Sequence, residues 1–269
     1  MPLRRLCGSA GMMAFGEYAK YYDLLYADKD YAAESAFVGE IIHRHAPGAR
    51  SLLELGCGSA RHALELIRKG FAVTGIDLSS QMIARGQAQI AQLPLELRSK
   101  IKLMQGDATR FTSAMPNDAV ISLFHVINYQ TTNDALKGIF RTARAALAED
   151  GIFIFDFWYG PAVLSERPQV RVKRIDTAEA CVIRIAEPTL DINRNVVDVN
   201  YTLIVADRAR GQTEEIKELH SVRYLFLPEI ELLAANSGFE IAESGEWLTG
   251  NRLHSRCWSG YVAARAIRN

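Results

Sequence analysis

Between residues 51 and 158 the sequence alternates short apolar runs with segments of helical periodicity. The apolar runs, SLLELG, FAVTGID, IKLMQGD, DAVISLF and GIFIFDFW, are typical of strands that are buried on both faces. Helical segments separate them, one ending near Ile67, one starting at Ser79 or Ser80, and one running from about Asn133 to Ala148. This alternation predicts an α/β fold in which helices cover both faces of a parallel sheet. A ligand is expected at the carboxyl ends of its strands.

The sequence pattern changes after Pro161. The runs VRVKRID, ACVIRIAE, VVDVNYTLIVAD and IKELHSVRYLFL indicate strands with no helix between them. Residues 161–225 are therefore expected to form a small antiparallel β insertion in a core made of residues 15–160 and 226–269. The core would begin with two helices before Pro47, and it would end with the helix PEIELLAANSGF and the strands EIAESGEWL and WSGYVAARA. Residues 1–14 are expected to be a mobile extension.

Composition excludes several classes of protein. Lys and Arg number 31, as do Asp and Glu, so no net charge attracts a polyanion such as a nucleic acid. The four cysteines are far apart and form no C-x-x-C pair, which favours reduced thiols in a cytoplasmic protein. No apolar run is long enough to span a membrane. No H-x-x-H motif or carboxylate cluster suggests a metal, so none is predicted.

The stretch LLELGCGSARHA joins the first of these strands to a glycine-rich turn. A phosphate-binding P-loop requires a Lys and a hydroxyl residue after the last glycine, and neither follows Gly58. The dinucleotide fingerprint G-x-G-x-x-G requires a small third residue, and Arg61 stands there instead. The turn is therefore expected to hold neither a nucleoside triphosphate nor a dinucleotide.

The residues around this turn suit a different ligand. Gly56 and Gly58 allow close approach of the backbone, and Asp77, at the end of the next strand, can accept hydrogen bonds from both hydroxyls of a ribose. Glu54 lies within an otherwise apolar strand, where an unpaired carboxylate is costly, so we expect it to have a functional partner.

This arrangement resembles the motif series of the class I S-adenosylmethionine-dependent methyltransferases. The later motifs follow in the same order, as GIDLSSQMI, GDAT, AVISLFHVINY and LAEDGIFIFDFW. The resemblance implies a Rossmann-like, seven-stranded, mostly parallel sheet and S-adenosylmethionine as the cofactor. It also implies cofactor contacts from Glu54, Gly56, Cys57, Gly58, Asp77 (ribose), Leu78 and Met82 (adenine faces), Asp107 and Ala108 (adenine amino edge), and Leu123 (methionine portion).

Three further stretches resemble the N,N-dimethyltransferases that act on nucleotide-linked amino sugars. They are YYDLLYADKDYAAE, ELGCGSARHA and ELHSVRYLFLPEIELLAANSGFE. This resemblance implies that Tyr22 and Tyr31 fold over the cofactor and that the insertion builds an acceptor site and often a homodimer contact. The fourth strand ends in FHVINYQ rather than a [DN]-P-P-Y motif, which, with the neutral charge, favours a small-molecule acceptor over a nucleic acid. Methylation of a hydroxyl and a non-catalytic cofactor-binding protein remain as alternatives.

Three residues are candidates for catalysis. Tyr129 stands where the amino-sugar enzymes have an active-site histidine; because a phenol is a weak base at neutral pH, it is expected to orient the acceptor. His125 follows the fourth strand and His220 lies in ELHSVRY, and for each a structural role is an equal alternative. Arg223, Arg252 and Arg256 could bind an anionic acceptor group or could be ordinary surface arginines, and Trp158 could shape the pocket.

Overall fold

The computed structural model of the chain describes residues 17–267. The expected mobile extension at residues 1–14, with Cys7, lies outside the described residues. Among the residues that are described, no helix is both long and apolar enough to cross a membrane.

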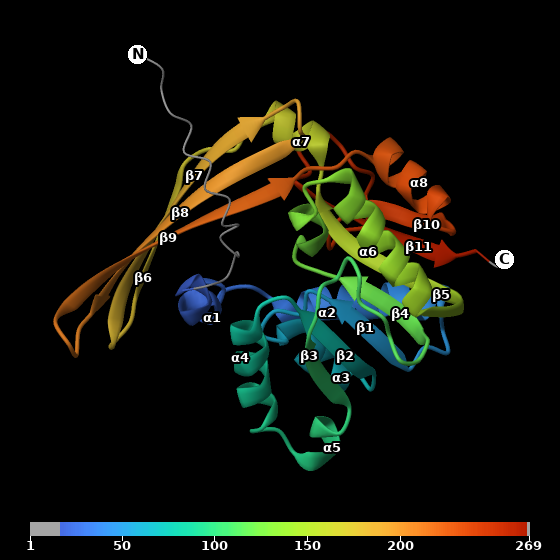
Figure 1. Ribbon diagram of the computed structural model, residues 1–269, viewed down its shortest axis with the longest axis horizontal. Coiled ribbons are helices and arrows are strands. Elements are labelled where there is room, and N and C mark those ends of the chain that lie inside the picture. The colour runs from blue at the N-terminus through green and yellow to red at the C-terminus, as the bar shows by residue number, and fades with distance from the viewer. Residues whose placement is uncertain (1–16, 268–269) are drawn as a thin grey trace.

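A seven-stranded sheet forms the centre of the larger part of the molecule (Figure 1). Its strands are β1 (Ser51–Leu55), β2 (Ala72–Asp77), β3 (Ile101–Gln105), β4 (Asn117–Ser122), β5 (Leu147–Trp158), β10 (Phe239–Glu246) and β11 (Ser259–Ala266). They are ordered β10-β11-β5-β4-β1-β2-β3. Strand β11 runs opposite to all the others, so its pairings with β10 and β5 are antiparallel. The predicted Rossmann-like, mostly parallel sheet is confirmed.

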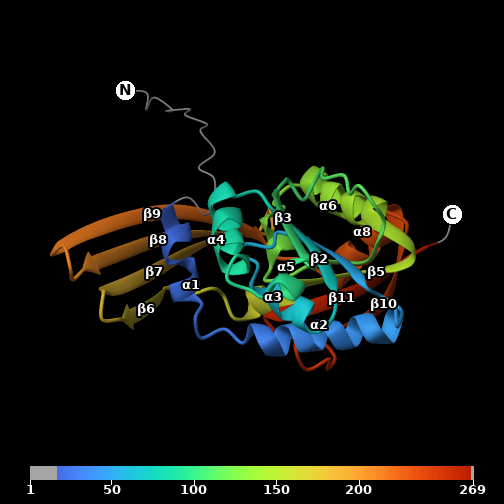
Figure 2. The same ribbon diagram turned by 90° about the horizontal axis from the view of Figure 1, so that it is seen from below.

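Helices cover both faces of this sheet (Figure 2). On one face lie α2 (Tyr31–His45), α3 (Arg61–Arg68) and α4 (Ser80–Ile90), which bury residues such as Val38, Leu66 and Ile83. On the other face lie α6 (Asn133–Ala146) and α8 (Leu227–Asn236), which bury Phe140 and Ile230. The apolar side chains of both sheet faces are thereby removed from water, as two-sided burial of a parallel sheet requires.

The helix that was predicted to run to about Ala148 ends two residues earlier. The helix ends at Ala146, and β5 begins at Leu147, which is in an extended conformation and pairs with Asn117 of β4. The Asn117 side chain donates to the carbonyl of Ala146 at 3.1 Å and so satisfies one of the open carbonyls at the helix end. The short helices η1 (Glu17–Tyr21), α1 (Tyr22–Leu25), α5 (Leu95–Arg98), η2 (Val126–Tyr129) and α7 (Gly160–Ser165) complete the described elements.

A separate four-stranded sheet follows α7. It consists of β6 (Arg171–Asp176), β7 (Ala180–Asp191), β8 (Val196–Asp207) and β9 (Gln212–Arg223), which pair antiparallel in sequence order. These strands confirm the predicted antiparallel β insertion as a feature of the fold, and Figure 1 shows them extending away from the larger sheet with α1 beside them. Tyr18, Tyr22 and Leu25 from η1 and α1 pack in one apolar cluster with residues of the small sheet such as Leu203 and Ile216.

Candidate functional site

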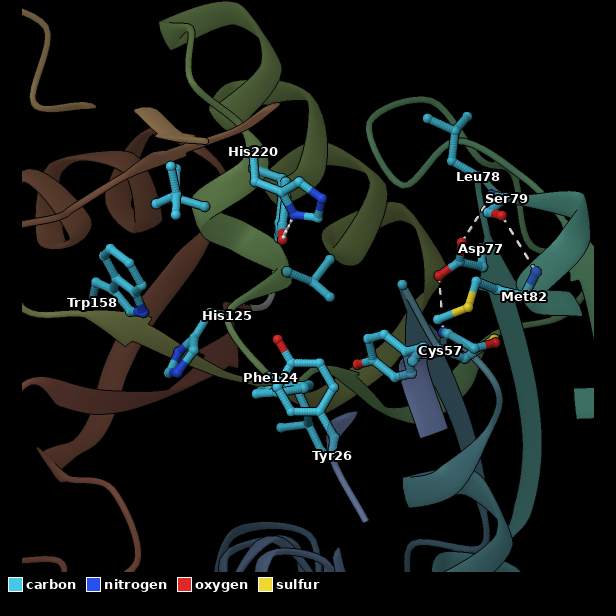
Figure 3. Close-up of a pocket in the computed structure, with 18 of the residues that line it drawn as sticks. Tyr26, Cys57, Asp77, Leu78, Ser79, Met82, Phe124, His125, Trp158 and His220 are labelled. Atoms are coloured by element: carbon cyan, nitrogen blue, oxygen red, sulfur yellow. Dashed lines mark hydrogen bonds between the residues drawn. The ribbon is translucent and has the colours of Figure 1, made fainter. Parts of the chain in front are cut away.

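A cavity of about 630 Å³ lies at the carboxyl ends of β1, β2 and β4, where the strand order of the large sheet reverses. Residues of both sheets line it. Figure 3 shows Cys57, Asp77 and Met82 at one end of the cavity and His125 and Trp158 at the other, with Phe124 between them. A volume of this size is typical of a site for small molecules.

The glycine turn at the end of β1 brings the backbone to the cavity wall. Gly56 and Gly58 have φ of +77° and +52°, in the left-handed region that favours glycine. A Cβ on Gly56 would lie 2.4 Å from Cγ1 of Val126, so no larger residue fits there without movement. Ala60 also has a positive φ, +67°, and caps the start of α3.

Asp77 closes this turn from the neighbouring strand β2. Its Oδ2 accepts the N–H of Gly58 and its Oδ1 accepts the N–H of Ser79, both at 2.8 Å. Burial raises the pKa of the Asp77 carboxyl, and these two N–H donors oppose that shift. A carboxylate has further acceptor positions, so Asp77 can still receive hydroxyl donors from a ligand.

Of the predicted cofactor residues, all but Glu54 line the cavity. They are Tyr22, Tyr31, Gly56, Cys57, Gly58, Asp77, Leu78, Met82, Asp107, Ala108 and Leu123. Asp107 also caps its own turn, since it accepts the N–H of Thr109 at 2.9 Å and pairs with Arg110 at 2.8 Å. A cofactor with a ribose and an adenine ring suits this lining, because a carboxylate stands beside the apolar side chains of Leu78 and Met82.

Glu54 lies behind the cavity wall rather than in it. It is 1% exposed, its Oε1 is 3.8 Å from Nδ1 of His62, and its Oε2 has no hydrogen-bond partner among the described residues. Burial and the nearby negative charge of Asp77 raise the pKa of Glu54 to about 8. His62 is itself bonded to Glu34 at 2.7 Å, and Lys29 pairs with the same carboxylate.

His125 lies at the far end of the cavity and contacts a buried acid. Its backbone N–H donates to both carboxylate oxygens of Asp156 in β5, at 3.0 and 3.1 Å, and its Nδ1 is 2.7 Å from Oδ2, although not aligned for a hydrogen bond. Phe124 and His125 both have positive φ, +63° and +62°, a conformation that is strained in non-glycine residues. The Asp156 carboxylate therefore contacts both the strained backbone N–H of His125 and its imidazole ring.

The other two catalytic candidates touch one another. The Tyr129 hydroxyl lies 2.9 Å from Nδ1 of His220, and Nε2 of His220 lies 3.1 Å from Oε2 of Glu218. Tyr129 comes from η2 of the core, whereas His220 and Glu218 come from β9 of the small sheet. The structure thus brings His125, Tyr129 and His220 into the lining of one cavity.

The candidate arginines lie elsewhere. Arg223 pairs with Glu229 and donates to Asn133, while Arg252 and Arg256 are exposed, and none of the three lines the cavity. Sequence reasoning missed Asp156 and Glu218. Each had a signal, because Asp156 interrupts an apolar strand as Glu54 does, and Glu218 shares a strand face with His220 two residues later.

One group among the described residues offers mixed metal ligands. Atoms of Glu246, His254 and Cys257 lie within 4.8 Å of one another. Nδ1 of His254 accepts the N–H of Arg256 at 3.2 Å, and Glu246 accepts the hydroxyl of Thr249 at 2.7 Å. Glu246 and His254 thus already have protein partners, and the expectation of no metal stays a prediction.

Comparison with known proteins agrees with this geometry. A family model described as a methyltransferase domain matches residues 52–151. The chain is 26% identical over 237 residues to dTDP-3-amino-3,4,6-trideoxy-alpha-D-glucopyranose N,N-dimethyltransferase of Streptomyces venezuelae, a match that covers 87% of this chain and 93% of that protein. It is 25% identical over 252 residues to dTDP-3-amino-3,6-dideoxy-alpha-D-glucopyranose N,N-dimethyltransferase of Streptomyces fradiae, covering 93% and 92%.

The fold is also that of a solved methyltransferase. The crystal structure of an S-adenosylmethionine-dependent methyltransferase from Clostridium acetobutylicum superposes with a TM-score of 0.77 at 20% identity, covering 95% of this chain and 100% of that one. The glycine turn, the carboxylate of Asp77 and these similarities lead to one conclusion. The chain is an S-adenosylmethionine-dependent methyltransferase, and residues 52–151 carry its match to the methyltransferase domain model.

Proposed function

We propose that this enzyme methylates the nitrogen of a nucleotide-linked amino sugar. The names of the two Streptomyces relatives describe N,N-dimethylation of dTDP-linked amino sugars, and their matches extend over the four-stranded sheet as well as the core. The observation that carries the proposal is one continuous cavity that runs from the glycine turn to the imidazoles of His125 and His220.

The cofactor would occupy the end of the cavity beside the glycine turn. We infer that Asp77 accepts the ribose hydroxyls, that Leu78 and Met82 contact the faces of the adenine, and that Asp107 and Ala108 meet its amino edge. The glycines allow backbone contact at Gly56, Cys57 and Gly58, and Leu123 lies beside the methionine portion. The bound cofactor supplies an electrophilic methyl group on a sulfonium.

The tyrosines of the amino-terminal segment would cover that sulfonium. The rings of Tyr22 and Tyr26 pack at a tilt of 52° with 4.8 Å between centroids, and Tyr26 meets Phe124 edge-on at 5.0 Å. Aromatic faces attract cations, so these rings suit a positively charged sulfur and an ammonium acceptor alike. They also keep water away from the reacting atoms.

The acceptor would occupy the other end, beneath the four-stranded sheet. Ala186, Pro188, Val199, Tyr201 and Val222 of this sheet line the cavity there. We infer that the sheet forms the roof of the acceptor site, and that Trp158 and His125 form its opposite wall. Methyl transfer then needs little beyond alignment of the nitrogen with the methyl carbon, which is worth several kcal/mol, roughly 7 to 11 in favourable cases.

Methylation of a hydroxyl is the second candidate. The two histidine–carboxylate pairs, His125 with Asp156 and His220 with Glu218, provide the ordered acid–base groups that a hydroxyl acceptor requires. The same pairs would deprotonate an ammonium, so the nature of the acceptor must be tested directly.

The test is incubation of the purified enzyme with S-adenosylmethionine and dTDP-3-amino-3,6-dideoxy-alpha-D-glucopyranose, followed by mass spectrometry. We expect the sugar nucleotide to gain one or two methyl groups, while the matched sugar with a hydroxyl in place of the amine gains none. Methylation of the hydroxyl sugar alone would support the second candidate. Absence of turnover with amino sugars carrying the amine at any ring position would overturn the proposal.

A further inference from the structure

Tyr129, His220 and Glu218 form a chain of hydrogen bonds that ends at the acceptor side of the cavity. His220 is 3% exposed and Glu218 is 8% exposed, whereas Tyr129 and His220 both line the cavity. The second oxygen of Glu218, Oε1, accepts the backbone N–H of Tyr18 at 3.0 Å. The carboxylate is therefore fixed on one side by η1 and on the other by the imidazole.

The hydrogen bonds in this chain determine which nitrogen of His220 carries a proton. An ionised carboxylate only accepts hydrogen bonds, so Glu218 selects the imidazole tautomer with its proton on Nε2. Nδ1 of that tautomer is an acceptor, and the Tyr129 hydroxyl at 2.9 Å therefore donates to it. The phenolic oxygen keeps lone pairs with which it can accept a proton from the acceptor.

The surroundings favour transfer along this chain rather than loss to solvent. The ring of His220 lies 5.4 Å from that of Tyr18, 5.8 Å from Tyr129 and 4.9 Å from Tyr201. Among residues 17–267, the titratable groups that face His220 include Tyr18 from η1, Tyr129 from η2, Tyr201 from β8 and Glu218 from β9. Arg184 of β7 lies over the Tyr201 ring at 5.5 Å.

We propose that this chain is a proton relay that converts the acceptor ammonium into the nucleophilic amine. One N–H bond of the ammonium breaks as its proton moves to the Tyr129 oxygen. In the same step the Tyr129 O–H bond breaks and its proton forms an N–H bond at Nδ1 of His220. Glu218 stabilises the resulting imidazolium. Tyr129 is the catalytic residue, and Glu218 is a positioning residue that acts through His220.

Methyl transfer follows the deprotonation of the acceptor. The amine lone pair forms the N–C bond, the C–S bond breaks, and the sulfur keeps the electron pair. The proton held by His220 leaves to solvent when the product departs, which resets the chain for a second methyl group. Burial raises the pKa of Tyr129 well above its usual value, so a free tyrosinate is disfavoured and the phenol must pass on one proton as it takes another.

The relay rests on the proposed function, because its substrate is the amino sugar. Steady-state kinetics with the dTDP-amino sugar test the relay. Tyr129→Phe should lower kcat by about 10²-fold, in the range typical of acid–base groups, with KM for the sugar within about twofold. Glu218→Gln should lower kcat and move the acidic limb of its pH profile to lower pH, because the imidazolium loses its counter-ion. Glu215→Gln, an exposed substitution on the same strand, is the matched control. Unchanged kcat in Tyr129→Phe or an unmoved limb in Glu218→Gln overturns the relay.

A second measurement does not depend on the acceptor. In the enzyme saturated with S-adenosylhomocysteine, ¹⁵N NMR of His220 should report a proton on Nε2 and an accepting Nδ1, and Glu218→Gln should weaken that preference. A proton on Nδ1 overturns the relay even if amino sugars are methylated. If no amino sugar is methylated, the proposed function fails, and the tautomer still decides whether the chain points toward the cavity.

Discussion

Two ion pairs lie near the glycine turn. Lys29 pairs with Glu34, and Arg85 pairs with Asp23 at 2.9 Å. Arg61 lines the cavity and stacks on the ring of Tyr31 at 4.8 Å, but it has no carboxylate partner among the described residues. Arg61, the residue that argues against a dinucleotide, is thus a cation that a ligand in the cavity can contact. S-adenosylmethionine carries an α-carboxylate, which such a cation could bind.

We therefore predict that Arg61 binds the carboxylate of the cofactor. Hydrogen bonds to charged groups contribute about 1.5–3 kcal/mol, so Arg61→Ala should weaken S-adenosylmethionine binding about 10- to 100-fold. Binding of 5′-methylthioadenosine, which lacks the amino-acid portion, should be unchanged. Isothermal titration calorimetry measures both. Arg68→Ala, at the exposed end of the same helix, is the control, and an equal loss for the two ligands would show that Arg61 acts on the fold instead.

Glu54 should make the stability of the enzyme depend on pH. Its pKa is about 8 in the folded state and near 4.5 when unfolded, so between these values the folded state binds a proton that the unfolded state has released. Stability is then highest below pH 4.5 as far as Glu54 is concerned, and it falls as the pH rises through 8. The full loss is on the order of a few kcal/mol.

Urea unfolding of the ligand-free protein at pH 5.5 and pH 8 checks this. Glu54→Gln should remove most of the decrease, since the amide does not ionise. The exposed substitution Glu231→Gln should keep the wild-type slope. Parallel pH dependences of wild type and Glu54→Gln would contradict the assignment.

The glycine turn depends on contact between two loops as well as on backbone conformation. Gly56 and Gly211 both have positive φ, +77° and +63°, but a Cβ on Gly211 would meet nothing within 4 Å, whereas one on Gly56 would meet Val126. The two positions therefore separate the conformational cost of a side chain from its steric cost.

Gly211→Ala should cost about 1 kcal/mol of unfolding free energy, the usual penalty of a left-handed alanine. Gly56→Ala should cost more and should also weaken S-adenosylmethionine binding, because Val126 must move. Adding Val126→Ala removes the clashing methyl groups and should recover part of the extra cost, which a double-mutant cycle measures. Equal losses for the two single variants would mean that the contact with Val126 contributes nothing.

The glycine-turn end of the site is local in the chain, whereas Tyr129 and His220 were predicted only as separate candidates. Gly56, Gly58 and Asp77 follow consecutive strands, and parallel strands bring their carboxyl ends to one edge, so periodicity and motif order were sufficient. The end of the cavity beneath the four-stranded sheet is different. Tyr129 and His220 are 91 residues apart and meet only because β9 of the small sheet lies over η2. No local pattern encodes that contact.

The end of α6, which was predicted too late, and the backbone before η2, for which no prediction was made, also depend on residues distant in the chain. The end of α6 is fixed by Asn117, a residue of the neighbouring strand, and not by a helix-terminating residue. His125, the second of the two left-handed residues before η2, donates its backbone N–H to Asp156 of β5. The domain boundaries at residues 160 and 226 and the homodimer contact stay predictions.

The amino-terminal segment joins the two sheets across the cavity. The N–H of Tyr18 bonds to Glu218 in the small sheet, and Lys173 of β6 donates to the carbonyl of Leu25 at 2.7 Å. Asp23 accepts from Ser59 in the glycine turn at 2.7 Å and from Arg85 of α4. Tyr22 and Tyr26 of the same segment line the cavity, so a cofactor bound as proposed would contact the segment that joins the glycine turn to the four-stranded sheet.

Cofactor binding should therefore stabilise this segment. With S-adenosylhomocysteine bound, hydrogen exchange measured by mass spectrometry should slow in residues 20–29 and 56–60, because opening either region would forfeit ligand contacts. The exposed β6–β7 turn at residues 177–179 makes no contact with the cavity and should exchange at an unchanged rate. Asp23→Ala removes the link to Ser59 and Arg85, so protection of residues 20–29 should fall more than protection of residues 56–60. If residues 20–29 exchange equally fast with and without the ligand, the segment does not couple the cofactor to the small sheet, and the two sheets bind their ligands independently.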